Sequence, residues 1–237
     1  MSDEKTVKVP SGVLRDALDA VLLAVARRSD GRPVLAGAHF RAVGGRLALT
    51  GTDSYRAHRY TVPCEGDDFD ALVESPPAAT IVPRRAYGPA TALGAPGLTI
   101  RVGSKETSLP RIDGTYPNVD AIREGVPEEK FSCDLASDER AQRFLRLANH
   151  VGITTSVRVE RRKAESLALT LETEYGRLEC EWATSDERGE LEPFLADPGY
   201  LLDAISSFPT PRLRVASPLR PILLEAGAGR WALVMPK

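Results

Sequence analysis

The sequence predicts an α+β protein of two tandem domains, each with two helices packed on antiparallel sheets. One observation is an internal repeat: the tetrapeptide LALT at residues 47–50 returns at 167–170, and Tyr55 returns as Tyr175, both 120 residues later. Another is that both halves follow the order helix, strands, short helix, strands. A single tetrapeptide match can arise by chance, but the shared order of elements favours a duplicated domain.

The first predicted helix covers residues 11–28, with Ser11 as its potential N-cap. Its apolar side chains recur at helical spacing. These are Leu14, Leu18, Val21, Leu22 and Val25. Strand-like segments follow at residues 33–43 and 46–62, where apolar and polar positions alternate on either side of the glycines at 44 and 45. This pattern predicts a β-hairpin.

The first half closes with a short helix near residues 84–93 and a strand pair over residues 98–112. Gly88 and Pro89 make this helix irregular, because glycine and proline both disfavour a helix interior.

The second half repeats the series. A helix over residues 137–151 has Ser137 as its potential N-cap and one apolar face. That face carries Ala141, Phe144, Ala148 and Val151. A hairpin over residues 156–184, a short helix that begins at 197 and ends before Pro209, and strands from 211 onwards complete it. The polar joint at 108–130 divides the chain into domains 1–125 and 126–237.

Composition excludes several classes of protein. With 42% hydrophobic and 27% charged residues, the chain is typical of a globular protein. Neither a signal peptide nor an apolar run of roughly 20 residues is present, so we expect no membrane contact. Cys64, Cys133 and Cys180 are far apart and without a Cys-x-x-Cys pair, which favours reduced thiols over a zinc site or disulfides. These features predict a cytoplasmic protein.

Arginines on the predicted helices suggest a surface for phosphates, although the net charge is only −2. The alternative is a set of ordinary solvated helix faces. Helix faces rich in arginine contact the DNA backbone without reading sequence, and no motif for base recognition is visible. The candidate DNA-facing residues are Arg15, Arg27, Arg28, Arg84, Arg85, Arg140, Arg143 and Arg146.

Catalysis is the rival class of function. Asp53, His58 and Cys64 lie close in sequence, but neighbours along a strand alternate between faces, and a nucleophile turn is not apparent. The segment Ser2-x-x-Lys5 matches a fragment of the serine-acylase motif, but it lies at the amino terminus, which is an improbable place for an active site. The three histidines lack metal-ligand spacing, and nucleotide-binding loop motifs are absent. We therefore predict a protein that is not an enzyme and needs no cofactor or metal.

Three segments resemble a known family: RPVLAGAHFRAVGGRLALTGTDSYRAHR at 32–59, RIDGTYPNVDAI at 111–122 and PLRPILLEAGAGRWALVMPK at 218–237. Together they look like the bacterial sliding clamp, the beta subunit of DNA polymerase III. The resemblance covers the middle and last domains of that three-domain family, and the Thr-Asp-x-x-Arg element and the closing Met-Pro are its most specific parts. It implies that the two domains have the clamp fold.

Clamps of this family are rings in which six domains surround duplex DNA, with helices lining the hole. Two domains per chain would need three chains, so the resemblance implies a homotrimer, and the similar length of phage clamps suggests a virus-encoded protein. It also implies partners: double-stranded DNA without sequence preference, a DNA polymerase and an ATP-driven clamp loader.

The resemblance further implies a hydrophobic pocket, between the two domains, for short peptides of those partners. The matching residues are Leu35, Thr52, Ser54, Tyr55, Arg56, Ala57, Leu233, Met235 and Pro236. Ala57 replaces a frequent leucine, and the chain ends at Lys237, both of which put the peptide preference in doubt. Core packing of Met235 and a surface salt bridge between Arg56 and Asp53 are the ordinary alternatives.

The sequence thus predicts a DNA sliding clamp that acts as a polymerase processivity factor. The alternative is a clamp-fold interaction module that does not encircle DNA, such as a decoy or a transcription accessory factor that binds clamp partners.

Overall fold

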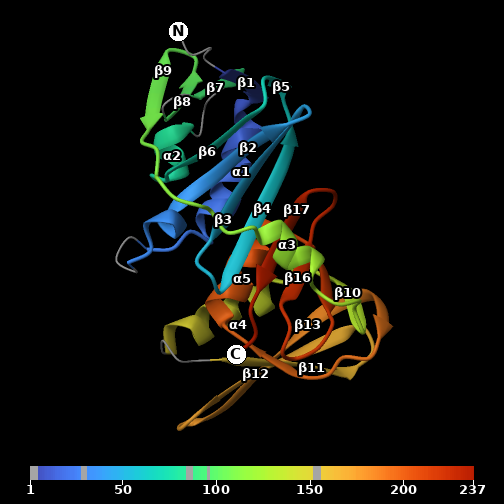
Figure 1. Cartoon of the computed structure of the whole chain (residues 1–237). Coiled ribbons are helices and arrows are strands. Elements are labelled where there is room, and N and C mark those ends of the chain that lie inside the picture. The colour runs from blue at the N-terminus through green and yellow to red at the C-terminus, as the bar shows by residue number, and fades with distance from the viewer. Residues whose placement is uncertain (1–4, 28–30, 84–87, 95–96, 152–155) are drawn as a thin grey trace. The chain divides into compact units, whose positions relative to one another are not determined.

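The same series of strands and helices occurs twice along the chain in a computed structural model, which describes residues 5–27, 31–83, 88–94, 97–151 and 156–237 (Figure 1). The chain forms two compact units. The first unit comprises Met1–Pro117 with Ala228–Arg230, and the second comprises Asn118–Gly227 with Trp231–Lys237. Helix α3 (Val119–Glu124) therefore belongs to the second unit, whereas the sequence-based division after residue 125 assigned it to the first.

The first unit contains two antiparallel sheets. Its elements are β1 (Lys5–Pro10), α1 (Ser11–Leu22), η2 (Pro33–Ala36), β2 (Gly37–Val43), β3 (Arg46–Thr52), β4 (Arg56–Pro63), β5 (Glu65–Gly66), β6 (Phe69–Glu74), α2 (Ala78–Ile81), β7 (Pro89–Gly94), β8 (Leu98–Val102) and β9 (Lys105–Leu109). One sheet has the order β5-β1-β7-β8-β9, and the other contains β4, β3, β2 and β6 in that order.

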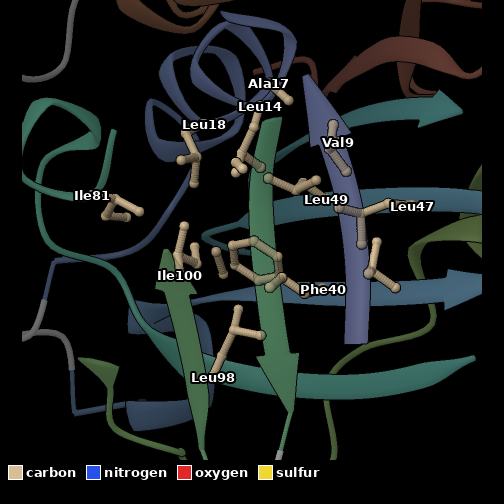
Figure 2. Close-up of a cluster of buried hydrophobic side chains, with 14 of the residues drawn as sticks. Val9, Leu14, Ala17, Leu18, Phe40, Leu47, Leu49, Ile81, Leu98 and Ile100 are labelled. Carbon is tan, nitrogen blue, oxygen red and sulfur yellow. The ribbon is translucent and has the colours of Figure 1, made fainter. Parts of the chain in front are cut away.

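The core of the first unit lies between these sheets and α1. Figure 2 shows Leu14 and Leu18 of α1 close to Phe40 of β2 and Ile100 of β8. All four side chains are buried. Residues at i and i+4 share one helix face, and residues two apart share one sheet face, so the apolar spacing predicted from the sequence directs these side chains to one core.

The second unit repeats this plan. Its elements after α3 are β10 (Phe131–Leu135), α4 (Glu139–Val151), β11 (Val157–Lys163), β12 (Ser166–Thr173), β13 (Gly176–Gly189), β14 (Phe194–Ala196), α5 (Pro198–Ser207), β15 (Arg212–Val215), β16 (Ile222–Glu225) and β17 (Arg230–Val234). The strand order is β14-β11-β12-β13-β10-β15-β16-β17. Helix α4 packs against α5.

The pairing of strands shows that the two units are structural repeats. Strands β2, β3, β4 and β6 pair among themselves as β11, β12, β13 and β14 do, and β1 pairs with β7 as β10 pairs with β15. The LALT sequences lie on the equivalent strands β3 and β12. The predicted α+β fold class and the predicted duplication are therefore confirmed.

The hairpin predicted around Gly44 and Gly45 is confirmed as the β2–β3 connection. Val43 lies opposite Arg46, which leaves a loop of these two glycines with φ of 58° and 74°. A two-residue loop with positive φ at both positions matches the right-handed twist of the flanking strands, and glycine adopts that backbone without steric cost.

Two helix predictions in the first half were wrong. Helix α1 ends at Leu22 instead of residue 28, and Ser11 is a buried residue of its first turn, with Pro10 at the N-cap position. The short helix is α2 at Ala78–Ile81, and Pro89–Gly94 is strand β7. Pairing of β7 with β1 and β8 satisfies its backbone hydrogen bonds, which a helix containing Gly88 and Pro89 would do poorly.

The helix predicted over residues 137–151 is confirmed as α4, with two differences. The carboxylate of Asp138, not the hydroxyl of Ser137, accepts a hydrogen bond from the backbone N–H of Arg140, at 2.8 Å. Val151 is half exposed, and Leu145 is buried in its place beside Ala141 and Ala148. The predicted hairpin at 156–184, the short helix before Pro209 and the terminal strands are confirmed by β11–β13, α5 and β15–β17.

Candidate functional site

The Thr-Asp-x-x-Arg element forms the turn between β3 and β4 in the first unit. The Thr52 hydroxyl donates to the Arg56 carbonyl at 2.6 Å and accepts from the Ser54 backbone N–H at 3.2 Å. Ser54 has a φ of 80°, in the left-handed region that few non-glycine residues adopt. The Ser54 hydroxyl accepts a hydrogen bond from Arg32 at 2.9 Å. These bonds hold the turn in one conformation.

The Asp53 carboxylate accepts three hydrogen bonds within the same turn. Its Oδ1 atom accepts the backbone N–H groups of Tyr55 and Arg56 at 2.9 and 3.0 Å, and its Oδ2 atom accepts the Arg56 Nε–H at 3.1 Å. Both side chains are 13% exposed. The Arg56 guanidinium is therefore engaged inside its own turn, which agrees with the ion pair considered as the ordinary alternative to peptide binding.

The turn presents Tyr55 to solvent, with 57% of its surface exposed. Leu35, Thr52 and Ala57 are buried. Among the first unit's predicted pocket residues, Ser54 and Tyr55 thus offer the most accessible surface, and the buried ones support the turn.

The remaining predicted pocket residues lie at the end of the second unit. Leu233 is buried on β17, whereas Met235, in the segment after that strand, is 38% exposed. This segment is anchored by Lys237, whose backbone N–H donates to the Leu195 carbonyl at 3.0 Å and whose Nζ lies 2.9 Å from an Asp197 carboxylate oxygen. The segment that contains the exposed Met235 is therefore fixed at its end, through Lys237, to Leu195 of β14 and to Asp197. That all the predicted residues form one pocket stays a prediction.

The three arginines of α4 lie on its solvent face. Arg140, Arg143 and Arg146 are exposed, on the side of the helix away from the buried Ala141, Leu145 and Ala148. Each has a nearby partner: Arg140 pairs with Asp138 at 3.3 Å, Arg143 with Glu139 at 2.6 Å, and Arg146 donates to the Gln142 side chain at 3.3 Å. The carboxylates near these three guanidinium groups are those of Asp138 and Glu139 and, at longer range from Arg140, that of Glu181.

The first unit has no matching arginine stripe along the part of α1 that the structure describes. Arg15 is only 11% exposed, since its guanidinium donates to the Val82 carbonyl and to Asp19, both at 2.7 Å. Arg15 therefore offers little surface to a phosphate, and its assignment to a DNA-facing surface stays a prediction. Arg27 is exposed but follows the helix instead of lying on it. Arg28, Arg84 and Arg85 lie outside the described residues.

Solved structures of bacterial replication proteins have this architecture. The beta subunit of DNA polymerase from Streptococcus pyogenes matches with a TM-score of 0.86 at 16% identity, over 100% of this chain and 66% of that chain. The sliding clamp from Bacillus subtilis matches at 0.85 and 16%, over 100% and 65%. The DNA polymerase III beta subunit from Thermotoga maritima matches at 0.84 and 17%, over 98% and 65%. The chain has the sliding-clamp fold.

This chain spans just under two thirds of the length of those clamps. No protein-family model matches it, and no curated protein is similar to it in sequence. The resemblance read from the three sequence segments is thus supported at the level of the fold.

The residues considered for catalysis have separate partners within the clamp fold. His58 is buried on β4, where its Nδ1–H donates to the Ala20 carbonyl at 2.8 Å, and burial lowers its pKa to about 4. Burial raises the pKa of the Cys64 thiol, and Asp53 is engaged in its own turn. Within the described segments, no group of His, Cys, Asp or Glu could hold a metal ion, and no helix is long and apolar enough to span a membrane.

A charged cluster in the second unit was not expected from the sequence. The Glu225 carboxylate binds Arg123 of α3 and, at 2.9 Å, Arg214 of β15, and Arg214 also binds Glu129 at 2.5 Å. The Arg123 guanidinium lies 5.8 Å from the ring centroid of Trp231. The segment 108–130 had been interpreted as a polar joint, and only the tertiary structure brings its Arg123 and Glu129 to strands about a hundred residues away.

Proposed function

We propose that the protein is a DNA sliding clamp, a closed ring that moves along duplex DNA and holds a polymerase to its template. The observation that carries this proposal is the match of nearly the whole chain to polymerase III beta subunits and sliding clamps, with TM-scores of 0.83–0.86. The duplicated fold supports it, because repeated units that join head to tail close into a ring when the rotation between them divides the circle.

The proposed ring is a homotrimer. Three copies of a chain with two clamp units supply the six domains that the resemblance implies. The ring would act by geometry and not by catalysis: a closed ring stays linked to circular DNA without tight binding. An ATP-driven loader would open it.

The proposed DNA surface is centred on α4. Exposed arginines attract phosphates through a salt-dependent interaction that does not depend on base sequence, and this allows sliding. Arg140, Arg143 and Arg146 provide such a surface. Their carboxylate neighbours weaken individual contacts, which suits a protein that moves along DNA.

The proposed partner surface includes Tyr55 in the first unit and Met235 in the second. Both are exposed, and both belong to segments that hydrogen bonds hold in place. An aromatic ring and a thioether offer adaptable apolar contacts to a short hydrophobic peptide. The Ser54 hydroxyl and backbone groups of the turn could fix the peptide's polar atoms.

The decisive experiment measures topological linkage. The protein is loaded by a clamp loader and ATP onto nicked circular DNA, and its retention during gel filtration is compared before and after the circle is cut by a restriction enzyme. A ring should stay on the circle and be lost from the linear product through the free ends. Equal retention on both, or a mass of one chain by light scattering at every concentration, would overturn the proposal in favour of the interaction module that does not encircle DNA.

A further inference from the structure

A short segment after β9 covers part of the sheet β6-β2-β3-β4 in the first unit, on the face away from the core. The Ile112 N–H donates to the Leu72 carbonyl of β6 at 2.9 Å. The Tyr116 hydroxyl donates to the Thr50 carbonyl of β3 at 3.2 Å, and the Tyr116 ring centroid lies 5.0 Å from that of His39 on β2. Residues 112–116 therefore contact three neighbouring strands of this sheet.

The duplication identifies the same face in the second unit. The threonine that ends each LALT sequence marks one position in both sheets. In the first unit, its cross-strand neighbours on β2 and then β6 are His39 and Leu72. In the second unit, its cross-strand neighbours on β11 and then β14 are Arg158 and Leu195. Arg158 is therefore the equivalent of His39, and Leu195 is the equivalent of Leu72.

The main chain reaches this face in the same way in both units. The Lys237 N–H donates to the Leu195 carbonyl at 3.0 Å, as the Ile112 N–H donates to the Leu72 carbonyl. Lys237 is therefore the equivalent of Ile112. In the second unit, the described residues contain no segment that corresponds to residues 113–116 of the first.

This face of the second unit is accordingly more open than its equivalent. Leu195 is 39% exposed, whereas Leu72 is 7% exposed. The Arg158 side chain is 48% exposed, whereas the His39 side chain is 18% exposed. A groove of about 910 Å³ lies here, and Arg158 and Leu195 are among the residues that line it. Its volume falls in the range of ligand-binding sites.

We infer that this groove binds a short segment of a partner protein whose aromatic side chain stacks on Arg158, as Tyr116 lies beside His39. A guanidinium attracts the face of an aromatic ring and packs against it. Leu195 offers apolar surface beside it, and an aromatic hydroxyl would reach the Thr170 carbonyl. This inference goes beyond the proposed function and does not depend on the ring.

The charges of the groove indicate what flanks the aromatic residue. Glu172 and Glu174 line the groove, and among the described residues neither forms an ion pair. Arg177, the cross-strand neighbour of Glu172, binds Glu179. Glu172 follows Thr170 by two residues, so its carboxylate lies near the expected place of the aromatic ring. A lysine or arginine next to the aromatic residue would neutralise these carboxylates, so the partner segment combines an aromatic with a basic residue.

Binding of a labelled peptide tests this inference. The probe has the sequence RIDGTY, residues 111–116 of this chain, followed by lysine. Fluorescence polarisation should show saturable binding. Replacing the tyrosine of the probe by alanine should weaken binding about tenfold, and replacing its lysine by glutamate should weaken binding about threefold or more.

Variants of the protein locate the binding site. Leu195→Asp and Arg158→Ala should each weaken binding at least about fivefold. Two matched controls make the same changes elsewhere in the second unit: Leu219→Asp, where the leucine is 85% exposed, and Arg188→Ala, where the arginine side chain is 71% exposed. Both controls should bind the probe as the unchanged protein does. Circular dichroism checks that each variant folds.

The inference is wrong if the probe does not bind saturably at up to about 1 mM, or if the controls weaken binding as much as Leu195→Asp does. A different result identifies another occupant. If the probe does not bind but Leu195→Asp lowers the mass found by light scattering while Leu219→Asp does not, a second copy of the chain covers the groove. The outcome for the ring is measured separately by retention on circular DNA, so either proposal can fail without the other.

Discussion

Asp53 holds Arg56 by an ion pair of 3.1 Å in which each side chain is only 13% exposed, and the same carboxylate accepts the Tyr55 and Arg56 backbone N–H groups. One carboxylate thus fixes both the conformation of the β3–β4 turn and the position of its arginine. The exposed Tyr55 owes its orientation to this arrangement.

Replacement of Asp53 by alanine should destabilise the protein by roughly 2–3 kcal/mol, because it removes one carboxylate that accepts hydrogen bonds from the Arg56 guanidinium and from two backbone N–H groups. Urea unfolding measures this change. The double variant Asp53→Ala/Arg56→Ala should lose less than the sum of the single variants, because the two side chains interact directly and each single variant already removes that interaction. Additive losses would show that the pair contributes little.

The variant Tyr55→Ala should weaken binding of a short hydrophobic clamp-binding peptide about tenfold or more, while the stability of the protein changes by less than about 0.5 kcal/mol. Fluorescence polarisation with a labelled peptide measures the affinity. Tyr175 is a matched control, because it is 92% exposed on the tip of the equivalent hairpin in the second unit. Tyr175→Ala should leave the affinity unchanged, and an equal loss in both variants would remove Tyr55 from the partner surface.

Removal of Arg140, Arg143 and Arg146 by alanine substitution should weaken DNA binding and reduce the slope of log affinity against log salt concentration by roughly 2–3, at about 0.9 for each lost phosphate contact. Titrations of duplex DNA at several salt concentrations give this slope. A control with the same change in net charge replaces the exposed Arg41, Arg111 and Arg188, which lie on strands or loops. If the control lowers the slope equally, α4 is not the DNA surface.

His58 should make stability depend on pH. Its pKa in the folded protein is about 4, below the ordinary value of 6.5, because burial disfavours the imidazolium. The unfolded chain therefore binds more protons in this range, so stability is complete above pH 6.5 and falls as the pH falls toward 4. Between pH 7.5 and 5 the loss should be about 2 kcal/mol.

Urea unfolding at several pH values measures this loss. The variant His58→Gln should show a flatter dependence across the same range, whatever its stability at neutral pH. An unchanged dependence would show that another group is responsible.

The sequence predicted the duplicated architecture and most strands. Strands and turns are predictable because the alternation of apolar residues and the glycines at turns are features of a few neighbouring positions. Helix ends were less predictable. Helix α1 ends at Leu22, and beyond it the Ala26 N–H donates to the carbonyl of Leu35 in the 3₁₀ segment η2, at 2.9 Å. This hydrogen bond joins two residues whose contact cannot be predicted from a local sequence pattern.

The candidate surfaces also depend partly on neighbouring residues and partly on contacts between distant segments of the chain. The Thr-Asp-x-x-Arg element was recognisable from the resemblance to the sliding-clamp family. The arginines of α4 were recognisable from residue type and spacing, because a helix face is set by near neighbours in the chain. Which arginine is available to a ligand was not recognisable. Arg15 and Arg143 look alike in the sequence, yet one binds the carbonyl of Val82 and the other is exposed, because burial depends on segments that folding brings together from far along the chain.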